Sequence, residues 1–245
     1  MPHAARKWYS LVPPEWTRET SLEMSDAKIQ FAEAALAGQP YRPRSPRFFR
    51  HPFFAWVGLR SPIAQHTAAE HAALEKYARA RKSLVEIGVA EGASAVALRT
   101  AMDPQGVLYL IDPFYLSRVR PLNFLRRAAH RIVSGGSLPK IAWIESFSQD
   151  AIRSWNSPID FLLIDGDHEE TAVERDWNDW HPYVTPNGIV AFHDARLFPG
   201  GWTSPDYGPV RFIDRAFRSN LSSLWTIVEE VDSLVVVARR DRVPE

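Results

Sequence analysis

The chain has 245 residues, a formal net charge of +0 at pH 7 and a sequence pI of about 7.1. This length can bury the core of one large domain, and the charge balance excludes a global electrostatic attraction to nucleic acid or to a membrane surface. The absence of cysteine excludes a disulfide framework, a thiolate zinc site and a cysteine nucleophile, and it agrees with a cytoplasmic location.

Residues 1–60 are expected to form an N-terminal extension with helical and aromatic parts. Residues 25–37 have helical spacing and end at Gly38, a suitable C-terminal glycine. Residues 39–60 are rich in basic, aromatic and proline residues, which fits a nucleic-acid-binding arm or an ordered loop. The basic residues lie on no obvious helix face, so the loop is favoured. The extension is expected to be a substrate lid or the contact of a homo-oligomer, with no nucleic-acid or membrane partner.

Residues 61–245 are expected to form one α/β domain, because apolar strand-like runs alternate with helical patterns. Ser61–Pro62 is a helix-start signal, and that helix should reach about Ala80. The alternation predicts a doubly wound, mostly parallel seven-stranded sheet, and the last two strands, joined at 231–233, predict an antiparallel C-terminal hairpin. The predicted strands are 84–87, 107–111, 141–144, 159–165, 188–192, 225–228 and 234–238.

The stretch from Leu84 to Ser94 combines a buried strand, a glycine turn and the start of a helix. The order Glu-x-Gly-x-x-x-Gly, formed by Glu86, Gly88 and Gly92, differs from the glycine fingerprint of NAD-binding proteins. The helix N-terminus suits an anionic group, whereas Glu86 would attract a cation. The pattern therefore favours a ligand with both an amino group and a carboxylate, such as an amino acid attached to a nucleoside.

This pattern resembles motif I of the class I S-adenosylmethionine-dependent methyltransferases, whose Rossmann-like sheet also ends in an antiparallel strand. Asp112 follows the second strand, where an acid accepts hydrogen bonds from ribose hydroxyls, although it could simply cap a turn. Ser148–Gln149 resembles the adenine-side Ser-Gln-Asp of catechol O-methyltransferase, although Ser148 could also cap a helix. The resemblance implies S-adenosylmethionine as cofactor, held by Glu86, Gly88, Val89, Ala90, Gly92, Ser94, Asp112, Ser148, Gln149 and Asp165.

A second constellation follows the fourth and fifth predicted strands. Carboxylates at adjacent strand ends, Asp165 and Asp194, can converge on a hard cation such as Mg²⁺. Asp-Gly-Asp-His followed by His-Asp is similar to the macrocin-type antibiotic-tailoring O-methyltransferases, over about residues 84–194. That resemblance implies a divalent metal, Mg²⁺ first, bound by Asp165, His193 and Asp194, with Asp167 as a base. His193 stands where the group commonly has an acid, and imidazole suits Zn, Fe, Ni or Mn better than Mg²⁺.

Two alternatives to the metal remain open on the residues alone. His168 or His193 could take the acceptor's hydroxyl proton without a metal, or both could be structural. The leading hypothesis is an O-methyltransferase that acts on a hydroxyl of a small molecule, such as a natural product, sugar or phenol. An NAD-dependent oxidoreductase or epimerase and a non-catalytic binding module are the alternatives. An aromatic loop is expected to close over the site, with Phe198, Trp202 and Tyr207.

Overall fold

The computed structural model describes residues 47–114, 123–135, 139–219 and 224–242. The pattern of contacts between Cα atoms divides the chain into two units, residues 1–39 and residues 40–245. The first unit, with the helix predicted at residues 25–37, lies outside the described residues. The boundary expected at residue 60 stays a prediction.

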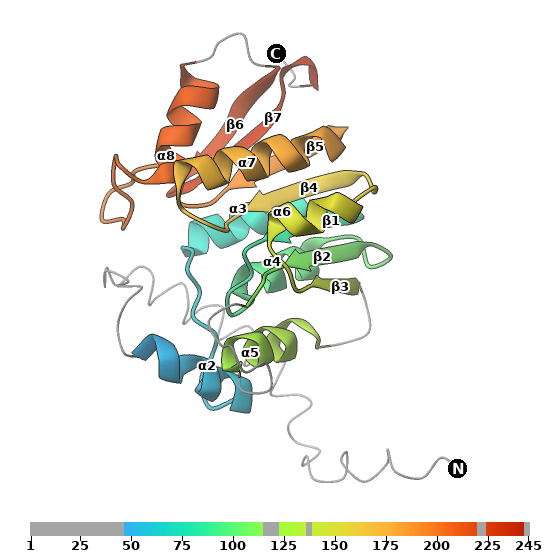
Figure 1. The fold of residues 1–245 in the computed structure, drawn as a ribbon, viewed down its shortest axis with the longest axis vertical. Helices are drawn as coiled ribbons and strands as arrows, with labels where there is room; N and C mark the ends of the chain where they lie inside the picture. Colours follow the sequence, from blue (N-terminus) through green and yellow to red (C-terminus); the bar gives the residue numbers. More distant parts are fainter. Residues whose placement is uncertain (1–46, 115–122, 136–138, 220–223, 243–245) are drawn as a thin grey trace. The chain divides into compact units, whose positions relative to one another are not determined.

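The described chain is built on a seven-stranded sheet with the order β3-β2-β1-β4-β5-β7-β6 (Figure 1). Strands β1 to β5 are parallel, and β7 lies antiparallel between β5 and β6. This is the doubly wound α/β sheet with an antiparallel C-terminal hairpin that the sequence predicts. The strands are β1 Ser83–Ile87, β2 Val107–Ile111, β3 Lys140–Ile144, β4 Ile159–Ile164, β5 Val184–Phe192, β6 Trp225–Val231 and β7 Leu234–Arg239.

Helices cover both faces of the sheet (Figure 1). One core forms between the sheet and α3, α4 and α5, and the other between the sheet and α6, α7 and α8. Side chains alternate between these cores along each strand; Leu84 packs in the first and Val85 in the second. No helix of the described ranges has the length and apolar character needed to cross a membrane. The helices are α2 Arg47–Val57, α3 Ala68–Ala78, α4 Ala93–Ala101, α5 Phe124–Val133, α6 Ser148–Ala151, α7 Glu170–Trp180 and α8 Gly208–Ile213.

The helix predicted to start at Ser61–Pro62 starts later, at Ala68, so that expectation is wrong. Thr67 is the N-cap of α3: its Oγ1 accepts a hydrogen bond from the Glu70 amide at 3.1 Å, and Glu70 Oε2 accepts one from the Thr67 amide at 2.7 Å. This capping box satisfies two amides that the first helical turn leaves free. Residues 61–67 are therefore a non-helical segment that leads into α3.

The segment 39–60, expected to be an ordered loop, contains the helix α2 instead. The helix packs against α5, where the Trp56 ring stacks on Phe124 at 5.7 Å and the Arg127 guanidinium lies 4.8 Å from the Trp56 ring centre. One aromatic residue of this segment, Trp56, thus makes a contact between two helices. Any contact of this segment with a partner subunit remains a prediction.

Two further boundaries differ from those predicted. Strand β5 begins at Val184 rather than Gly188, because the predicted turn before Gly188 is an irregularity within the β4–β5 pairing. Helix α8 begins at Gly208 rather than Val210 and continues as a π-helical turn over Asp214–Arg218. The carboxyl ends of β1 to β5, which position the site, lie within one residue of their predicted ends.

The register of the parallel strands brings the predicted polar residues to one edge. Hydrogen-bonded pairing aligns a single row across the sheet: Ile144, Ile111, Ile87, Ile164 and Phe192. The residues that follow this row include Gly88, Asp112, Asp165 and His193. Since all five strands point the same way, these residues are positioned side by side beyond the carboxyl ends of the strands, the usual place for a ligand in such a sheet.

Candidate active site

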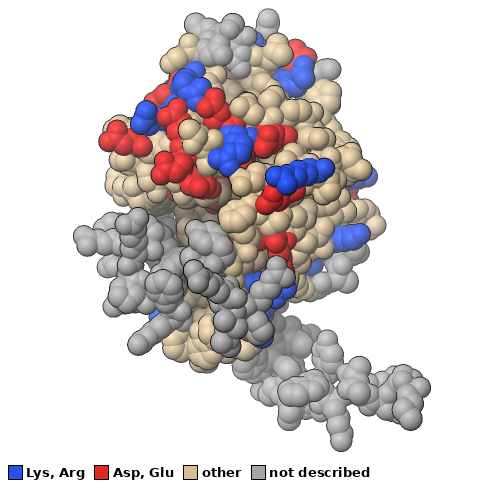
Figure 2. Space-filling model, in the orientation of Figure 1, with Lys and Arg blue, Asp and Glu red and all other residues tan. Residues whose placement is uncertain are grey.

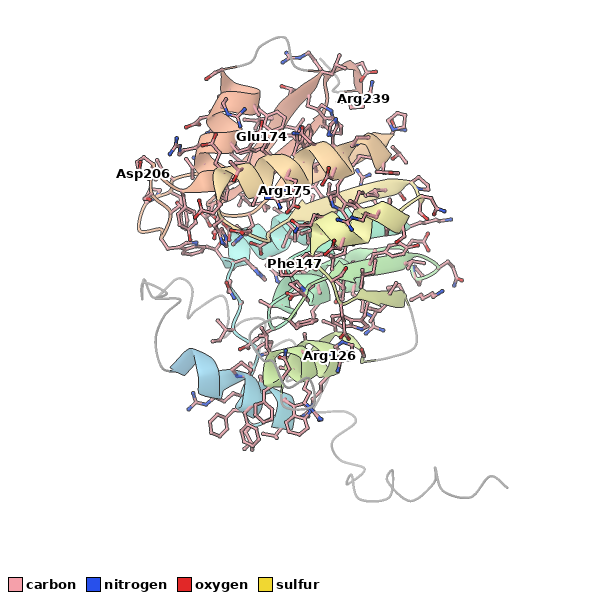
Figure 3. All side chains as sticks on the ribbon, viewed as in Figure 1. Arg126, Phe147, Glu174, Arg175, Asp206 and Arg239 are labelled. Carbon is pink, nitrogen blue, oxygen red and sulfur yellow. The ribbon has the colours of Figure 1, made fainter. Side chains whose placement is uncertain are left out.

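A cavity of about 740 Å³ opens at this edge of the sheet. Three residues that line it are labelled in Figure 3: Phe147 precedes α6, Arg175 lies on α7 and Asp206 lies in the loop before α8. The volume suits a nucleoside ligand together with a small acceptor. The predicted site residues that line the cavity are Gly88, Val89, Ala90, Ser94, Asp112, Ser148, Gln149, Asp165, Asp167 and His168.

Glu86 lies one layer behind the cavity, at the end of β1. Its side chain is fully buried, Oε1 accepts a hydrogen bond from the Ser94 hydroxyl, and Oε2 has no hydrogen-bond partner among the described residues. Burial raises the pKa of the Glu86 carboxyl well above its ordinary value. Because Ser94 lines the cavity, Glu86 is placed to act on a ligand through Ser94. A buried carboxyl oxygen left without a partner beside the cavity is consistent with a site for a group that carries hydrogen-bond donors.

Asp112 holds the glycine turn that follows β1. Its Oδ2 accepts hydrogen bonds from the amides of Val89, at 2.9 Å, and Ala90, at 3.1 Å, and its Oδ1 accepts one from Phe114 at 2.7 Å. Gly92 closes the same turn at φ +88° and caps α4. Asp112 therefore caps the turn, which was the structural alternative to a role in ribose binding. It also lines the cavity, and its role in binding ribose remains a prediction.

Ser148 is bonded to a buried acid that the sequence reasoning missed. The Ser148 hydroxyl donates to Asp176 Oδ1 at 2.5 Å, and Asp176, on α7, also lines the cavity although it is only 5% exposed. The residue that precedes α6 as its N-cap is Phe147, so the helix-cap alternative for Ser148 is wrong. Gln149 accepts a hydrogen bond from Arg175 on α7. The predicted adenine side of the cavity is thus formed by α6 and α7 together.

Asp176→Asn is expected to stabilise the folded protein at neutral pH. Burial raises the pKa of Asp176 to about 6, so the folded state holds this proton more tightly than the unfolded chain does. The free energy of unfolding should therefore fall as pH rises from about 4 to about 6 and then stay level. Asparagine keeps the acceptor for Ser148 without the charge, and the gain should reach roughly 3 kcal/mol above pH 7 and vanish near pH 3.5.

Urea unfolding of both proteins between pH 3.5 and pH 8 measures this gain. The control is Asp179→Asn on the same helix, which should change stability by no more than about 0.5 kcal/mol. A gain for Asp176→Asn that does not depend on pH would contradict the argument.

Asp165, His168 and Asp194 form a group that could hold a metal ion. Each offers one ligand atom, and these three atoms all lie within 4.8 Å of one another. His168 Nε2 is 3.0 Å from Asp194 Oδ2, and the His168 side chain is 39% exposed. Burial opposes a charge on His168, but Asp194 and Asp165 outweigh it and raise the pKa of the imidazole. Two carboxylate oxygens and one imidazole nitrogen fit a divalent cation such as Mn²⁺, Fe²⁺ or Zn²⁺ better than Mg²⁺.

His193, predicted as a metal ligand and as a base, does not line the cavity. Its side chain is 4% exposed, and Nδ1 lies 3.2 Å from Asp165 Oδ1 and 3.3 Å from Asp194 Oδ1, whereas Nε2 lies 3.4 Å from Glu70 Oε2. Burial opposes its charge, but Asp165 and Asp194 raise the pKa of His193 well above its ordinary value. Since carboxylates engage both ring nitrogens, the geometry favours His168 over His193 as the third ligand. Both predicted roles of His193 stay untested.

The aromatic loop after β5 packs against the same cluster. Trp202 Nε1 donates a hydrogen bond to Asp194 Oδ1 at 2.6 Å, and the Tyr207 ring centre is 5.3 Å from that of His168. Asp194 adopts a φ of +54°, a left-handed conformation that is uncommon outside glycine and frequent at functional sites. Two of the predicted lid residues, Trp202 and Tyr207, thus contact Asp194 and His168, and closure of the loop over a substrate remains a prediction.

Residues 61–67, which were predicted to be helical, supply part of the cavity wall. Ile63 and His66 line the cavity, and the Ile63 amide donates to Glu91 Oε2 at 2.7 Å. Burial, with the charges of His193 and His71, lowers the pKa of His66 to about 3, so this ring is neutral at working pH. The sequence reasoning missed His66, Glu91 and Glu70. The Thr67-x-x-Glu70 capping box could have marked the helix start, but it says nothing of the cavity.

Comparison with known families agrees with the motifs. A family model described as a methyltransferase domain matches residues 85–195. This range runs from β1 to the residue after Asp194 and so contains the glycine turn, Asp112, Ser148, the Asp-Gly-Asp-His segment and the strand-end acids. The match supports a methyltransferase rather than the NAD-dependent alternative that the sequence left open.

The fold is also similar to several solved structures. They include the O-methyltransferase NovP (TM-score 0.55, 16% identity, covering 89% of this chain and 98% of that one). Another is an O-methyltransferase from Bacillus cereus in complex with SAH (TM-score 0.53, 11% identity, 86% and 100% covered). A third is the O-methyltransferase TomG from Streptomyces achromogenes in complex with SAM (TM-score 0.51, 15% identity, 80% and 91% covered).

At these identities the likeness shows a shared fold, and the family match over residues 85–195 supplies the chemistry. The seven-stranded sheet with its antiparallel hairpin, the glycine turn after β1 and the acids at the strand ends all agree with it. The chain therefore has the fold of the class I methyltransferases, and its residues 85–195 match a methyltransferase domain.

Proposed function

We propose that this enzyme transfers the methyl group to a hydroxyl oxygen of a small molecule and that a divalent metal ion assists the transfer. The observation that carries the proposal is the group formed by Asp165, His168 and Asp194, two of which line the cavity itself. S-adenosylmethionine, when bound, supplies an electrophilic methyl group; a metal, when bound, lowers the pKa of the acceptor hydroxyl and orients it. A natural product, a sugar or a phenol would supply such a hydroxyl.

The residues of the cavity divide into two sets under this proposal. The first set would hold the methyl donor, and it includes Ser94, backed by Glu86, at one end and Ser148, bonded to Asp176, at the other. The second set, at the ends of β4 and β5, would hold the acceptor oxygen. Methyl transfer from a sulfonium is an in-line displacement, so the enzyme mainly has to align the oxygen and exclude water. Tyr207 and Trp202 would help to exclude water.

A metal-independent version of the same reaction is the second candidate. His168 lies 3.0 Å from Asp194 Oδ2 and lines the cavity, which is the arrangement of a general base held by a carboxylate. Asp167, exposed at the cavity and bonded through Oδ1 to the Glu169 amide at 3.1 Å, is the other candidate base. In this version the proton of the acceptor hydroxyl passes to one of these side chains as the methyl group is transferred.

Removal of divalent metal is expected to lower turnover by about 100-fold, because the acceptor would lose its activation. The purified protein would be treated with EDTA, dialysed and assayed by mass spectrometry with S-adenosylmethionine and a panel of phenols, sugars and amines. Mn²⁺ should restore more activity than Mg²⁺, because the ligand group includes imidazole. Turnover that EDTA does not change would rule out the metal and leave the His168 or Asp167 base. Methylation of amines alone would overturn the hydroxyl specificity.

The remaining expectations concern partners. On the face shown in Figure 2, acidic and basic side chains are interleaved, and on α7 Glu170 and Glu174 pair with Arg215 at 3.0 Å. Together with the formal net charge of +0, this supports a small-molecule acceptor over a nucleic acid. A homo-oligomeric or lid-like role for residues 1–60, and a cytoplasmic location, remain proposals that rest on the sequence.

A further inference from the structure

Glu70, on the first turn of α3, is a fully buried acid that none of the roles above uses. Its Oε1 accepts hydrogen bonds from the amide and the hydroxyl of Ser233, both at 2.6 Å, in the turn between β6 and β7. Its Oε2 accepts one from the Thr67 amide at 2.7 Å and lies 3.4 Å from His193 Nε2. One carboxylate thus connects a helix start, a hairpin turn and the end of β5.

The contacts of Glu70 Oε1 do not by themselves require an acid. The amide and the hydroxyl of Ser233 could be satisfied by one neutral acceptor, such as the amide oxygen of glutamine, and a buried carboxylate is costly unless a charge is paired with it. The paired group is His193, whose side chain is 4% exposed. The Glu70 carboxylate therefore pairs with the His193 imidazole in addition to accepting the hydrogen bond of the helix cap.

On its other side His193 faces the two acids of the candidate metal group. Its Nδ1 lies 3.2 Å from Asp165 Oδ1 and 3.3 Å from Asp194 Oδ1. Two carboxylates at adjacent strand ends repel each other, and a shared N–H between their Oδ1 atoms offsets that repulsion. It also orients both groups, so that Asp194 Oδ2 is turned to His168, 3.0 Å away.

We propose that Glu70 is a positioning residue that acts through His193: it holds the imidazole between Asp165 and Asp194, and so sets how tightly these acids and His168 bind a divalent cation. This inference rests on the proposed function. Groups behind a metal site that orient its ligands commonly change metal affinity by about 10- to 100-fold when they are replaced. Glu70 belongs to α3, outside the strands that supply the acids, so the affinity of the site depends on the docking of α3.

The test compares Glu70→Gln with Thr67→Ala in the full-length protein. Glutamine keeps one oxygen that can accept from the amide and the hydroxyl of Ser233, but it removes the acceptor of the Thr67 amide and the charge that faces His193. Thr67→Ala removes the hydroxyl that accepts from the Glu70 amide and donates to Asp232 Oδ2 at 2.6 Å, while the Glu70 carboxylate stays in place. Mn²⁺ binding is measured by electron paramagnetic resonance, S-adenosylmethionine binding by calorimetry, and unfolding by circular dichroism.

Glu70→Gln is expected to weaken Mn²⁺ binding by about 10- to 100-fold and leave S-adenosylmethionine affinity within about twofold. Thr67→Ala should lower the unfolding temperature without weakening Mn²⁺ binding. His193→Asn should weaken Mn²⁺ binding as Glu70→Gln does, and the double variant should bind like His193→Asn alone, because both substitutions break one chain of contacts.

Three results separate the possible failures. Wild-type protein that binds no Mn²⁺ overturns the metal in the proposed function. Wild-type affinity retained by a folded Glu70→Gln variant, or by His193→Asn if Glu70→Gln does not fold, overturns the positioning role alone. If the losses of Mn²⁺ affinity in Glu70→Gln and His193→Asn add up in the double variant, the positioning role is also overturned. Glu70 would then act on the site by a route that does not pass through His193.

Discussion

Asp165→Ala is expected to lower kcat/KM by about 1,000-fold and leave the protein folded. Asp165 lines the cavity at the end of β4, belongs to the candidate metal group and is the nearer partner of His193 Nδ1. Its loss would remove a ligand and free the His193 ring, so activation and alignment of the acceptor should both suffer. A 1,000-fold loss corresponds to about 4 kcal/mol of transition-state stabilisation. Methyl transfer is measured by mass spectrometry, with folding checked by circular dichroism.

Asp160→Ala provides the matched control because it lies on the same strand at the opposite edge of the sheet. Asp160 Oδ2 accepts hydrogen bonds from the amides of Lys82 and Ser83, both at 3.1 Å, so its loss should lower stability by about 1–3 kcal/mol. At a temperature where the Asp160→Ala variant is folded, its turnover should stay close to that of the wild type. Equal losses of turnover in the two variants would mean that Asp165 matters for folding rather than for chemistry.

Gly88→Ala is expected to destabilise the fold by roughly 4 kcal/mol or more, among the largest effects of a single substitution. Gly88 has a φ of +87°, and a Cβ there would lie 2.0 Å from the Asp165 carbonyl oxygen. That oxygen belongs to the backbone at the end of β4, so relief would require β1 and β4 to separate. The same movement would displace Asp165, and the variant should also lose binding of S-adenosylmethionine. Urea unfolding measures the first effect and calorimetry the second.

Gly200→Ala separates strain of the backbone from this clash. Gly200 also has a positive φ, +73°, but a Cβ there would meet nothing within 4 Å. Its substitution should cost only about 1–2 kcal/mol, the penalty for placing an alanine in a left-handed conformation. Equal losses of stability at Gly88 and Gly200 would show that the contact with Asp165 can relax without cost.

Local patterns in the sequence were sufficient for the framework of the site. Buried parallel strands read as short apolar runs, so the run before Gly88 and the run before Asp165 are found at nearly their observed bounds. Chain order then implies that the carboxyl ends of these strands lie along one edge, which groups Gly88, Asp112 and Asp165. Helix starts were less certain: Ser61–Pro62 and Thr67 are both valid signals, and only Thr67 caps a helix.

The chemistry of individual side chains depended on contacts that no local pattern encodes. Glu70 lies 123 positions from His193, and Ser148 lies 28 positions from Asp176. Such pairs form only when α3 packs against the end of β5, or α7 beside α6. The direction in which a strand-end side chain points is also set there: His193, next to the polar Asp194, reads as an exposed ligand in the sequence but is buried between carboxylates.

The sequence by itself determined that this chain is an α/β protein with acids at adjoining strand ends, because hydrophobic periodicity and glycine turns are properties of short segments. The tertiary structure alone decided that His168, rather than His193, lines the cavity and that the buried Asp176 lies beside it. Burial and pairing act over a few ångströms in space and join residues far apart in the chain, so they follow from the packing of helices on the sheet.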